Sequence, residues 1–368
     1  MKRRILGGTG MSVSEFALGA MMFGAMGNTD HDESVRMIHR ALDAGINFVD
    51  TADVYSRGES EEIVGQALKG RRDDVVLATK FALPMGSDAN QRGGSPRWVK
   101  RAVEDSLRRL GTDHIDLYQM HRPDPNTDIG ETLSALSDLV RSGKVRAIGS
   151  STFPAELIIE AQWAADKGGH HSFRTEQPRY SILTRTIEGG VLPIAQRYGI
   201  GVLTYGPLSS GWLSGRADPA QGHRAATAPR VFDLTVPANQ ARLAAVEQLT
   251  NLAAEAGMPL THLATAFVRS HPAVTSVLIG PRKPEQLDDL LAGADAELSE
   301  DVLDRIDEIM PSGTEVNPVD NYRAAHRRSR KRRAAADLLP RDLRPRSPHD
   351  DPATRLRMWI LATSKRFT

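Results

Sequence analysis

VVLAT (75–79) is a short apolar run, and the chain continues through SPRWVKRAVEDSLRRLG (95–111) into a second apolar run, IDLYQM (115–120). Short runs rich in β-branched and other apolar residues are typical of buried strands. The segment between them carries apolar residues at helical spacing, starts with Ser-Pro and ends with Gly, which favours helix boundaries at those points. The order strand, helix, strand predicts two parallel strands joined by a helix.

The same alternation continues from about residue 15 to about residue 280. Further strand candidates are INFV (46–49), VRAIG (145–149) and IGVLT (200–204), with weaker ones near Phe16 and Phe173. Further helices are predicted at residues 33–44, 129–141 and 299–309. About eight strands in this order predict an α/β fold, either an open doubly wound sheet or a closed eightfold barrel.

The N-terminal segment RRILGGTGMSVSEFALG (3–19) has a different pattern, with two short strand candidates around a glycine-rich turn. This pattern predicts a β-hairpin. The run Gly7-Gly8-Thr9-Gly10 superficially matches a dinucleotide-binding fingerprint. However, it lacks the preceding buried strand and the following helix that such a fingerprint needs, so we interpret it as the hairpin turn.

The composition is that of a globular protein with a sizeable core, since 40% of the 368 residues are hydrophobic and 25% are charged. The chain has no cysteine, which excludes disulfide bonds and thiol chemistry. The N-terminal residues lack the apolar region of a signal peptide, and no apolar run is long enough to cross a bilayer. We therefore expect a cytoplasmic protein without a membrane span.

The charge is divided unevenly along the chain. Residues 323–368 hold 14 Lys and Arg against 4 Asp and Glu, a net charge of +10, which leaves −9 for the remainder because the whole chain carries +1. We predict a folded domain at 1–315 and a basic, Pro/Arg-rich, disordered tail at 316–368. The arginine run at 327–333 would suit nucleic acid or anionic lipid, but a solvated extension is the simpler interpretation, and we expect no nucleic-acid partner.

Three consecutive strand candidates each run into an ionisable residue: Asp50, Lys80 and His121. Tyr55 follows Asp50 by five positions, in the loop after the same strand. In a parallel barrel the carboxyl ends of the strands share one face, which carries the active site. Taken singly, each residue has a structural explanation as a cap, an ion-pair partner or a turn residue. Their repetition at successive strand ends favours a polar site.

These four side chains are chemically compatible. A free phenol titrates at about 10, and a nearby ammonium favours its phenolate and makes the hydroxyl a better proton donor. Lys80 could supply that charge to Tyr55, Asp50 could hold Lys80, and His121 could orient a substrate oxygen. Such a set suits reduction of a carbonyl group, provided that a hydride donor is bound.

The chain resembles the aldo-keto reductases in four motifs: FVDTADVYSRGESEEIVGQAL (48–68), LATKF (77–81), LGTDHIDLYQMHRPD (110–124) and SGKVRAIGSS (142–151). It is most similar to the bacterial members related to the potassium-channel β-subunits, over residues 1–315. The resemblance implies a (β/α)8 TIM barrel and an NADP(H)-dependent oxidoreductase that reversibly reduces a small aldehyde or ketone to the alcohol. It also implies that the catalytic residues are Asp50, Tyr55, Lys80 and His121, with Tyr55 as the general acid.

The resemblance further implies a set of residues that bind NADP(H). Those near the nicotinamide are Gly19, Ala20, Met21, Ser151, Thr152, Gln177 and Tyr205. Those near the pyrophosphate are Gly206, Pro207, Leu208, Ser209, Ser210 and Arg216. Those near the adenosine phosphate are Gly280, Arg282 and Gln286, with Arg282 facing the 2′-phosphate. Two positions depart from the family: Thr152 stands where many members have Asn, and Leu290 where an Asn usually lies near the adenine.

Two alternatives and one absence complete the prediction. A non-catalytic, NADP(H)-binding regulatory subunit would keep the same four residues, as the channel β-subunits do. A protein that binds nucleic acid through its basic tail is the second alternative. His39, His170 and His171 have no carboxylates at metal-ligand spacing, so we predict no metal site.

Overall fold

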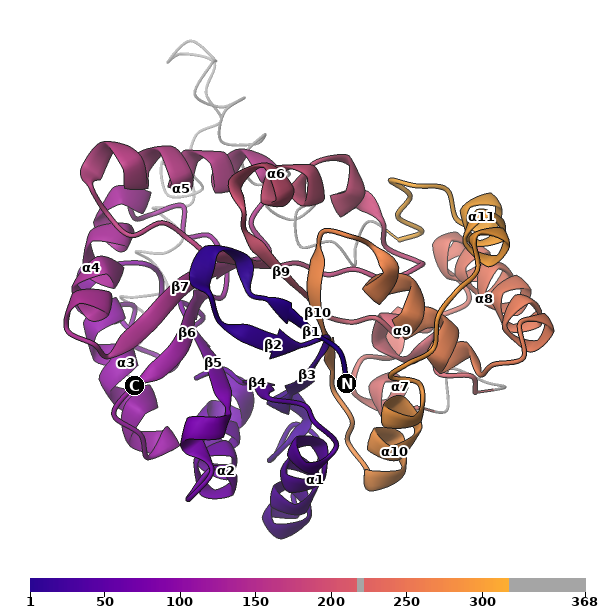
Figure 1. Cartoon of the computed structure of the whole chain (residues 1–368), viewed down its shortest axis with the longest axis horizontal. Coiled ribbons are helices and arrows are strands. Elements are labelled where there is room, and N and C mark those ends of the chain that lie inside the picture. Colours follow the sequence, from indigo (N-terminus) through magenta and orange to yellow (C-terminus); the bar gives the residue numbers. More distant parts are fainter. Residues whose placement is uncertain (217–221, 318–368) are drawn as a thin grey trace, which may run out of the picture. The chain divides into compact units, whose positions relative to one another are not determined.

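The computed structural model describes residues 1–216 and 222–317. Its centre is a closed barrel of parallel strands in the order β10-β3-β4-β5-β6-β7-β8-β9. The strands are β3 (Phe16–Gly19), β4 (Phe48–Asp50), β5 (Val76–Phe81), β6 (Ile115–Met120), β7 (Val145–Ser151), β8 (Thr175–Gln177), β9 (Gly201–Thr204) and β10 (Val274–Ile279). Helices lie around the outside of these strands (Figure 1). The predicted (β/α)8 barrel is therefore confirmed, and the open doubly wound sheet is excluded.

The helices follow the strands along the chain. They are α1 (His31–Asp43), α2 (Glu59–Ala67), α3 (Pro96–Leu110), α4 (Ile129–Arg141), α5 (Ala155–Gly168), α6 (Val191–Tyr198), α7 (His223–Thr227), α8 (Pro237–Glu255), α9 (Leu260–Ser270), α10 (Pro284–Ala292) and α11 (Glu300–Ile309). The stretch 206–237, which has the composition of a long loop, contains α7 and short 3-10 turns, and its residues 217–221 lie outside the described part.

Helices α3 and α4 have the bounds that their sequence patterns predict, because their ends carry strong local signals. The Ser95 side chain accepts a hydrogen bond from the backbone N–H of Trp98 at 3.3 Å, and the Asp128 side chain accepts one from Gly130 at 2.7 Å. These bonds satisfy N–H groups that the first helical turn leaves unpaired. Gly111 ends α3 in the left-handed conformation that glycine adopts without strain.

The N-terminal hairpin, β1 (Arg3–Ile5) and β2 (Ser12–Ser14), covers the amino-terminal end of the barrel. Leu6 and Val13 are fully buried and belong to the cluster inside the barrel. Between the strands, Gly7 packs so closely that a Cβ atom there would lie within 2.6 Å of the backbone at Arg174 and Gly201. The predicted hairpin is confirmed, and the glycine run forms its turn and starts no dinucleotide-binding helix.

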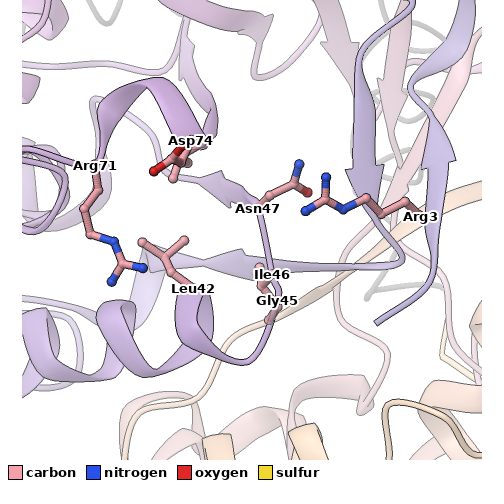
Figure 2. A pocket seen from close by; sticks show the side chains of 8 residues that line it. Arg3, Leu42, Gly45, Ile46, Asn47, Arg71 and Asp74 are labelled. Atoms are coloured by element: carbon pink, nitrogen blue, oxygen red, sulfur yellow. The ribbon is translucent and has the colours of Figure 1, made fainter.

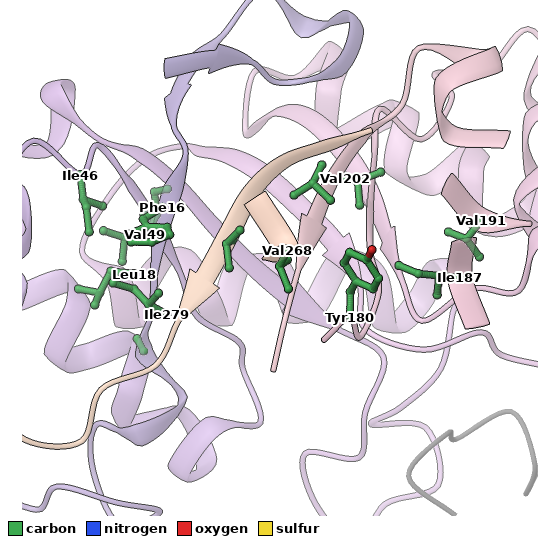
Figure 3. Packing of buried hydrophobic residues seen from close by; sticks show 14 of the residues in the cluster. Phe16, Leu18, Ile46, Val49, Tyr180, Ile187, Val191, Val202, Val268 and Ile279 are labelled. Atoms are coloured by element: carbon green, nitrogen blue, oxygen red, sulfur yellow. The ribbon is translucent and has the colours of Figure 1, made fainter. Parts of the chain in front are cut away.

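Two apolar clusters stabilise the barrel. The larger one fills the layer between the strands and the helices, and Figure 3 shows part of it, with Phe16, Leu18 and Val49 beside Ile279. The smaller one lies inside the barrel. It contains Ala17, Phe48, Ala78, Leu117, Ala147, Leu203 and Leu278. Because side chains alternate along each strand, neighbouring residues contribute to different clusters.

A hollow of about 330 Å³ opens near the amino-terminal ends of β4 and β5 and is lined by Arg3, Leu42, Gly45, Ile46, Asn47, Arg71, Asp74 and Val75 (Figure 2). Two of its polar side chains already have structural roles. Arg71 pairs with Asp43 at 2.7 Å, and the Asn47 amide oxygen accepts a hydrogen bond from the Ser14 backbone at 2.8 Å. It lies at the opposite end of the strands from the predicted polar site.

No helix in the described ranges, 1–216 and 222–317, is both long enough and apolar enough to cross a membrane. Most of the predicted disordered tail, from residue 318 on, lies outside the described residues. The disorder of this tail therefore stays a prediction.

Candidate functional site

Polar residues form the next layer inside the barrel, two positions beyond the small apolar cluster. Phe48, Ala78 and Leu117 belong to that cluster, and Asp50, Lys80 and Gln119 follow them on β4, β5 and β6. Since side chains alternate with a period of two, each polar residue points into the barrel above its apolar neighbour. The side chains of Asp50 and Lys80 therefore both point into the interior of the barrel, at the same level.

Asp50 and Lys80 form a buried ion pair. Their side chains are 2% and 0% exposed, and the ammonium of Lys80 donates a hydrogen bond to Oδ1 of Asp50. The same ammonium donates to the backbone carbonyl of Thr51 at 2.8 Å and to the hydroxyl oxygen of Tyr55 at 3.3 Å. Lys80 is thus held from one side by the strand that carries Asp50 and points at the phenol on the other.

The electrostatics of this group follow from burial and from the charges nearby. Burial raises the pKa of the Tyr55 hydroxyl, and the ammonium of Lys80 acts in the opposite direction. Burial lowers the pKa of Lys80, but Asp50 and Tyr55 together outweigh it, so the pKa is raised overall. Lys80 therefore stays charged at neutral pH, and its ammonium donates separate hydrogen bonds to the carboxylate and to the phenol.

His121 directly follows β6 and lies beside the phenol of Tyr55. The rings of Tyr55 and His121 meet edge to face, with centroids 5.6 Å apart. Burial, with the charges of Lys80 and Arg122, lowers the pKa of His121 well below its usual range, so the imidazole is neutral at neutral pH. Its buried Nδ1 has no hydrogen-bond partner within the described ranges. The four residues predicted to be catalytic therefore lie together.

The ends of β7, β8 and β9 bring four predicted cofactor residues together. The Ser151 hydroxyl donates to the backbone carbonyl of Gln177 at 2.9 Å, and the Thr152 backbone N–H donates to the same backbone oxygen at 3.1 Å. Thr152 has a left-handed backbone, with φ of 59°, and its hydroxyl lies 3.4 Å from that of Tyr205. On the facing side of the barrel, Gly19 is the register partner of Asp50 and continues into Ala20 and Met21.

The loop after β9 has an unusual backbone. Gly206, Ser209, Ser210 and Gly211 all have positive φ, at 71°, 48°, 63° and 108°. Successive turns of opposite hand direct backbone N–H groups into a concavity that suits an anion. Within the described residues the buried hydroxyl of Ser209 has no partner, and Pro207 and Leu208 complete the loop. This backbone fits the phosphate role that the sequence predicts for it.

The remaining predicted cofactor residues lie at the start of α10 and after the loop. The Gln286 side chain accepts hydrogen bonds from the backbone of Arg282 at 2.8 Å and of Lys283 at 3.2 Å. It thereby fixes the turn that carries Arg282, which directly follows Gly280 and Pro281. Arg216 is exposed and borders the segment that is not described. Leu290 is buried in the larger apolar cluster.

Three buried polar residues of this region were missed from the sequence. Gln119 donates to Asp50 Oδ2 at 3.0 Å. Glu176 accepts hydrogen bonds from the Ser150 hydroxyl at 2.5 Å and the Phe153 backbone at 3.0 Å, and burial raises its pKa to about 7. Burial, with the charge of Glu61, raises the pKa of Asp53 well above its usual range. The period-two alternation after Leu117 would have indicated Gln119.

No group of three His, Cys, Asp or Glu side chains that could hold a metal ion occurs in the described part of the chain.

Comparisons with known proteins identify relatives of this chain. A model of the Aldo/keto reductase family matches residues 15–311. The uncharacterized oxidoreductase YrpG of Bacillus subtilis is 40% identical over 324 residues, which cover 84% of this chain and 96% of that protein. The aldo-keto reductase YhdN of the same organism is 38% identical, covering 77% and 85%. A putative voltage-gated potassium channel subunit beta of Schizosaccharomyces pombe is 32% identical, covering 83% and 92%.

Proposed function

The chain belongs to the aldo/keto reductase family, and on that premise we propose that it is an NADP(H)-dependent enzyme that reversibly reduces a small aldehyde or ketone to the alcohol. One observation carries the proposal. The Tyr55 hydroxyl lies 3.3 Å from an ammonium that a buried carboxylate holds in place, and a neutral imidazole lies beside its ring.

Tyr55 is the proposed general acid. In reduction its hydroxyl gives a proton to the carbonyl oxygen, and in oxidation the phenolate takes the proton back. Burial disfavours that phenolate, and the hydrogen bond from the Lys80 ammonium compensates for part of the cost. Asp50 keeps Lys80 pointing at the phenol. The neutral ring of His121 orients the substrate oxygen by hydrogen bonding, since it lies next to the phenol and is not already ionised.

A nicotinamide cofactor, when bound, supplies the hydride that reaches the carbonyl carbon. We propose that Gly19, Ala20, Met21, Ser151, Thr152, Gln177 and Tyr205 hold its nicotinamide end. The positive-φ loop at 206–211 would take the pyrophosphate, because backbone that changes hand within a few residues is typical of anion-binding loops and the Ser209 hydroxyl is buried with no partner among the described residues. Arg216 would add positive charge there.

The preference for NADP(H) over NAD(H) rests on Arg282. Its backbone is fixed by Gln286, and the guanidinium remains partly exposed at the start of α10. A guanidinium keeps its charge and presents several donors in a plane, which matches the oxygens of a 2′-phosphate. Lys283 is adjacent and exposed, and would add to the positive potential at this point.

A regulatory subunit is the second candidate. The S. pombe relative is named as a putative voltage-gated potassium channel subunit beta. A chain with a regulatory role of that kind would bind NADP(H) without needing steady turnover. The two candidates differ in catalysis and agree in cofactor binding.

The deciding experiment measures NADPH oxidation by its absorbance against a panel of small aldehydes and ketones, together with direct NADPH binding. Turnover with any member of the panel, lost in Tyr55→Phe, supports the reductase. Tight NADPH binding without turnover across the panel favours the regulatory subunit. A chain that binds neither NADPH nor NADH would contradict both candidates.

A further inference from the structure

Gln119 occupies a central position in the polar layer. It is the register partner of Lys80 on β5 and of Gly149 on β7, and it is fully buried. Leu117, two residues earlier, points into the barrel as part of the interior cluster, so Gln119 points the same way at the next level. An amide at this depth must find partners inside the barrel, since leaving a buried polar group without a hydrogen bond is unfavourable.

Gly149 makes room for this side chain. A Cβ atom at Gly149 would overlap the hydroxyl of Thr175 and would lie 3.3 Å from Cγ of Gln119. The backbone of Gly149 is that of an ordinary strand residue, so glycine is required here by space. The neighbouring strand is thus shaped to let Gln119 extend across the interior.

The hydrogen bonds of Gln119 link two functional residues. Its Nε2 donates to Oδ2 of Asp50 at 3.0 Å, and its Oε1 accepts from Nε2 of Gln177 at 3.3 Å. Nε2 of Gln177 also donates to Oδ2 of Asp50, at 2.9 Å. Asp50 therefore receives Lys80 on one oxygen and two amides on the other.

This arrangement fixes which way each amide faces. An ionised carboxylate only accepts hydrogen bonds, so both amides must turn their NH₂ groups to Asp50. Gln119 then presents its carbonyl to Gln177. The NH₂ group of Gln177 donates one hydrogen to Gln119 and the other to Asp50. The amide group that Gln177 has left to offer a ligand is its carbonyl oxygen, which is an acceptor.

We propose that Gln119 is a positioning residue that occupies the second N–H of Gln177 and, together with Asp50, locks the carbonyl oxygen of Gln177 toward the cofactor, so that the site selects a carboxamide and rejects a carboxylate at the nicotinamide ring. A carboxamide can donate its N–H to that oxygen, whereas a carboxylate brings two acceptors against an acceptor. The inference rests on the proposed function, because it assumes that Gln177 meets the nicotinamide end of the cofactor.

The first test compares the dissociation constants of NADP⁺ and of its nicotinic acid analogue, in which a carboxylate replaces the carboxamide, by quenching of tryptophan fluorescence. The unmodified protein is expected to bind NADP⁺ at least about tenfold more tightly, which corresponds to one hydrogen bond of ordinary strength. In Gln119→Leu the Gln177 NH₂ group keeps its hydrogen bond to Asp50 but loses the acceptor of its second N–H. That N–H can then turn toward a ligand carboxylate, so the ratio of the two dissociation constants should fall.

A matched control is Gln162→Leu. Gln162 lies on α5 and donates to the Phe173 carbonyl at 2.9 Å, so its loss also removes a glutamine side chain and one hydrogen bond, outside the polar layer. This control should keep the ratio of the unmodified protein. The inference is overturned if Gln119→Leu, folded and able to bind NADP⁺, also keeps it.

Gln119→Glu tests the same point without removing volume, and decides the matter if Gln119→Leu does not fold. The protonated carboxyl group can donate to Asp50 and accept from Gln177, as the amide does, whereas the ionised one repels Asp50. NADP⁺ affinity in this variant should therefore approach that of the unmodified protein at low pH and fall steeply as pH rises. A pH dependence equal to that of the unmodified protein would overturn the inference. If the unmodified protein binds no nicotinamide cofactor, the proposed function itself fails.

Discussion

Two adjacent layers inside the barrel come from the same strands and differ in what holds them together. The lower layer contains Phe48, Ala78 and Leu117, and its contacts are apolar and non-directional. The upper layer, two residues further along each strand, contains Asp50, Lys80 and Gln119, and its contacts are hydrogen bonds with fixed partners. The lower layer tolerates changes of shape at a cost in stability, whereas the upper layer depends on which atom faces which.

The contrast has a physical origin in desolvation. Burying an apolar side chain is favourable by about 1.5–3 kcal/mol, whatever apolar neighbour it meets. Burying a charge is favourable only where an opposite charge and further hydrogen bonds compensate for the lost water. Lys80 has three such partners in Asp50, Thr51 and Tyr55. The upper layer is therefore a site that the lower layer supports from below.

The largest expected effect is on catalysis in the upper layer. Tyr55→Phe removes one hydroxyl and should lower kcat by about 10² to 10⁴, the usual contribution of a general acid. NADPH affinity should remain, because the ring stays in place. Tyr198→Phe, at a tyrosine that is 44% exposed on α6, is the matched control and should leave kcat unchanged. Retention of most of the kcat in Tyr55→Phe would remove Tyr55 from the role of proton donor.

The corresponding change in the lower layer should act on stability. Leu117→Ala leaves a cavity inside the barrel and should reduce the free energy of unfolding by about 2–5 kcal/mol. Leu234→Ala, at a leucine that is 46% exposed, should change it by less than about 0.5 kcal/mol. Urea denaturation measures both. If Leu117→Ala instead reduced kcat of the folded protein as strongly as Tyr55→Phe, the two layers would not be separable.

The sequence predicts these layers to different degrees. Alternating apolar runs and strong helix caps, such as Ser95 and Asp128, are local signals, so the α/β class with parallel strands and the bounds of α3 and α4 followed directly. The choice of a closed barrel over an open sheet came from the resemblance to the aldo-keto reductases. Asp50, Lys80 and His121 were identified as candidate site residues because each directly follows, or ends, a predicted strand. The role of Gln119 was missed because it lies within an apolar run, where an uncharged amide gives no sign of belonging to a polar site. Glu176 was missed because its partners, Ser150 and Phe153, are brought to it only by the pairing of β7 with β8.

The pKa of Glu176, which lies outside the barrel interior, predicts how the stability of the protein depends on pH. Its pKa in the folded protein is about 7, raised by burial, against about 4.5 for an ordinary glutamate. Between these values the folded state keeps a proton that the unfolded state has lost, so stability falls as pH rises through this window. In Glu176→Gln this loss is absent. The free energy of unfolding of the variant relative to the unmodified protein should therefore rise by about 2–3 kcal/mol between about pH 5 and about pH 8. A constant difference across this range would mean that Glu176 is ionised throughout.

Arg282 should show a smaller effect because it is partly exposed. Arg282→Ala is expected to reduce the preference for NADPH over NADH by about tenfold, as expected for one charge-assisted hydrogen bond in contact with solvent. Added salt should reduce the preference of the unmodified protein as well. Arg305→Ala, at an exposed arginine that pairs with Glu255, is the control. An unchanged ratio of NADPH to NADH dissociation constants in Arg282→Ala would place the 2′-phosphate elsewhere.

The smallest effect is expected from removing the basic tail. We propose that residues 1–315 form the reductase barrel and that 316–368 are a separate extension. The barrel closes through its own strands, and Glu315, the last residue of the proposed barrel, bridges Thr184. The Val316 backbone N–H also donates to the Leu183 carbonyl at 3.5 Å, so pairing with the barrel continues one residue past the predicted boundary. The sequence from 323 on carries a net +10 and little apolar surface. Ordering it would cost about 1–2 kcal/mol per residue in backbone entropy, with few apolar contacts to compensate.

A chain that ends at residue 322 should therefore keep the Tm and the kcat/KM of the full chain. The opposite charges of the tail and of the rest of the chain could still produce contacts at low salt, so both chains are compared at low and at high ionic strength. A loss of Tm that persists at high salt would mean that apolar residues near the end, Met358 to Leu361, pack on the barrel. In that case the tail would belong to the folded domain, and the two interior layers would not account for its stability alone.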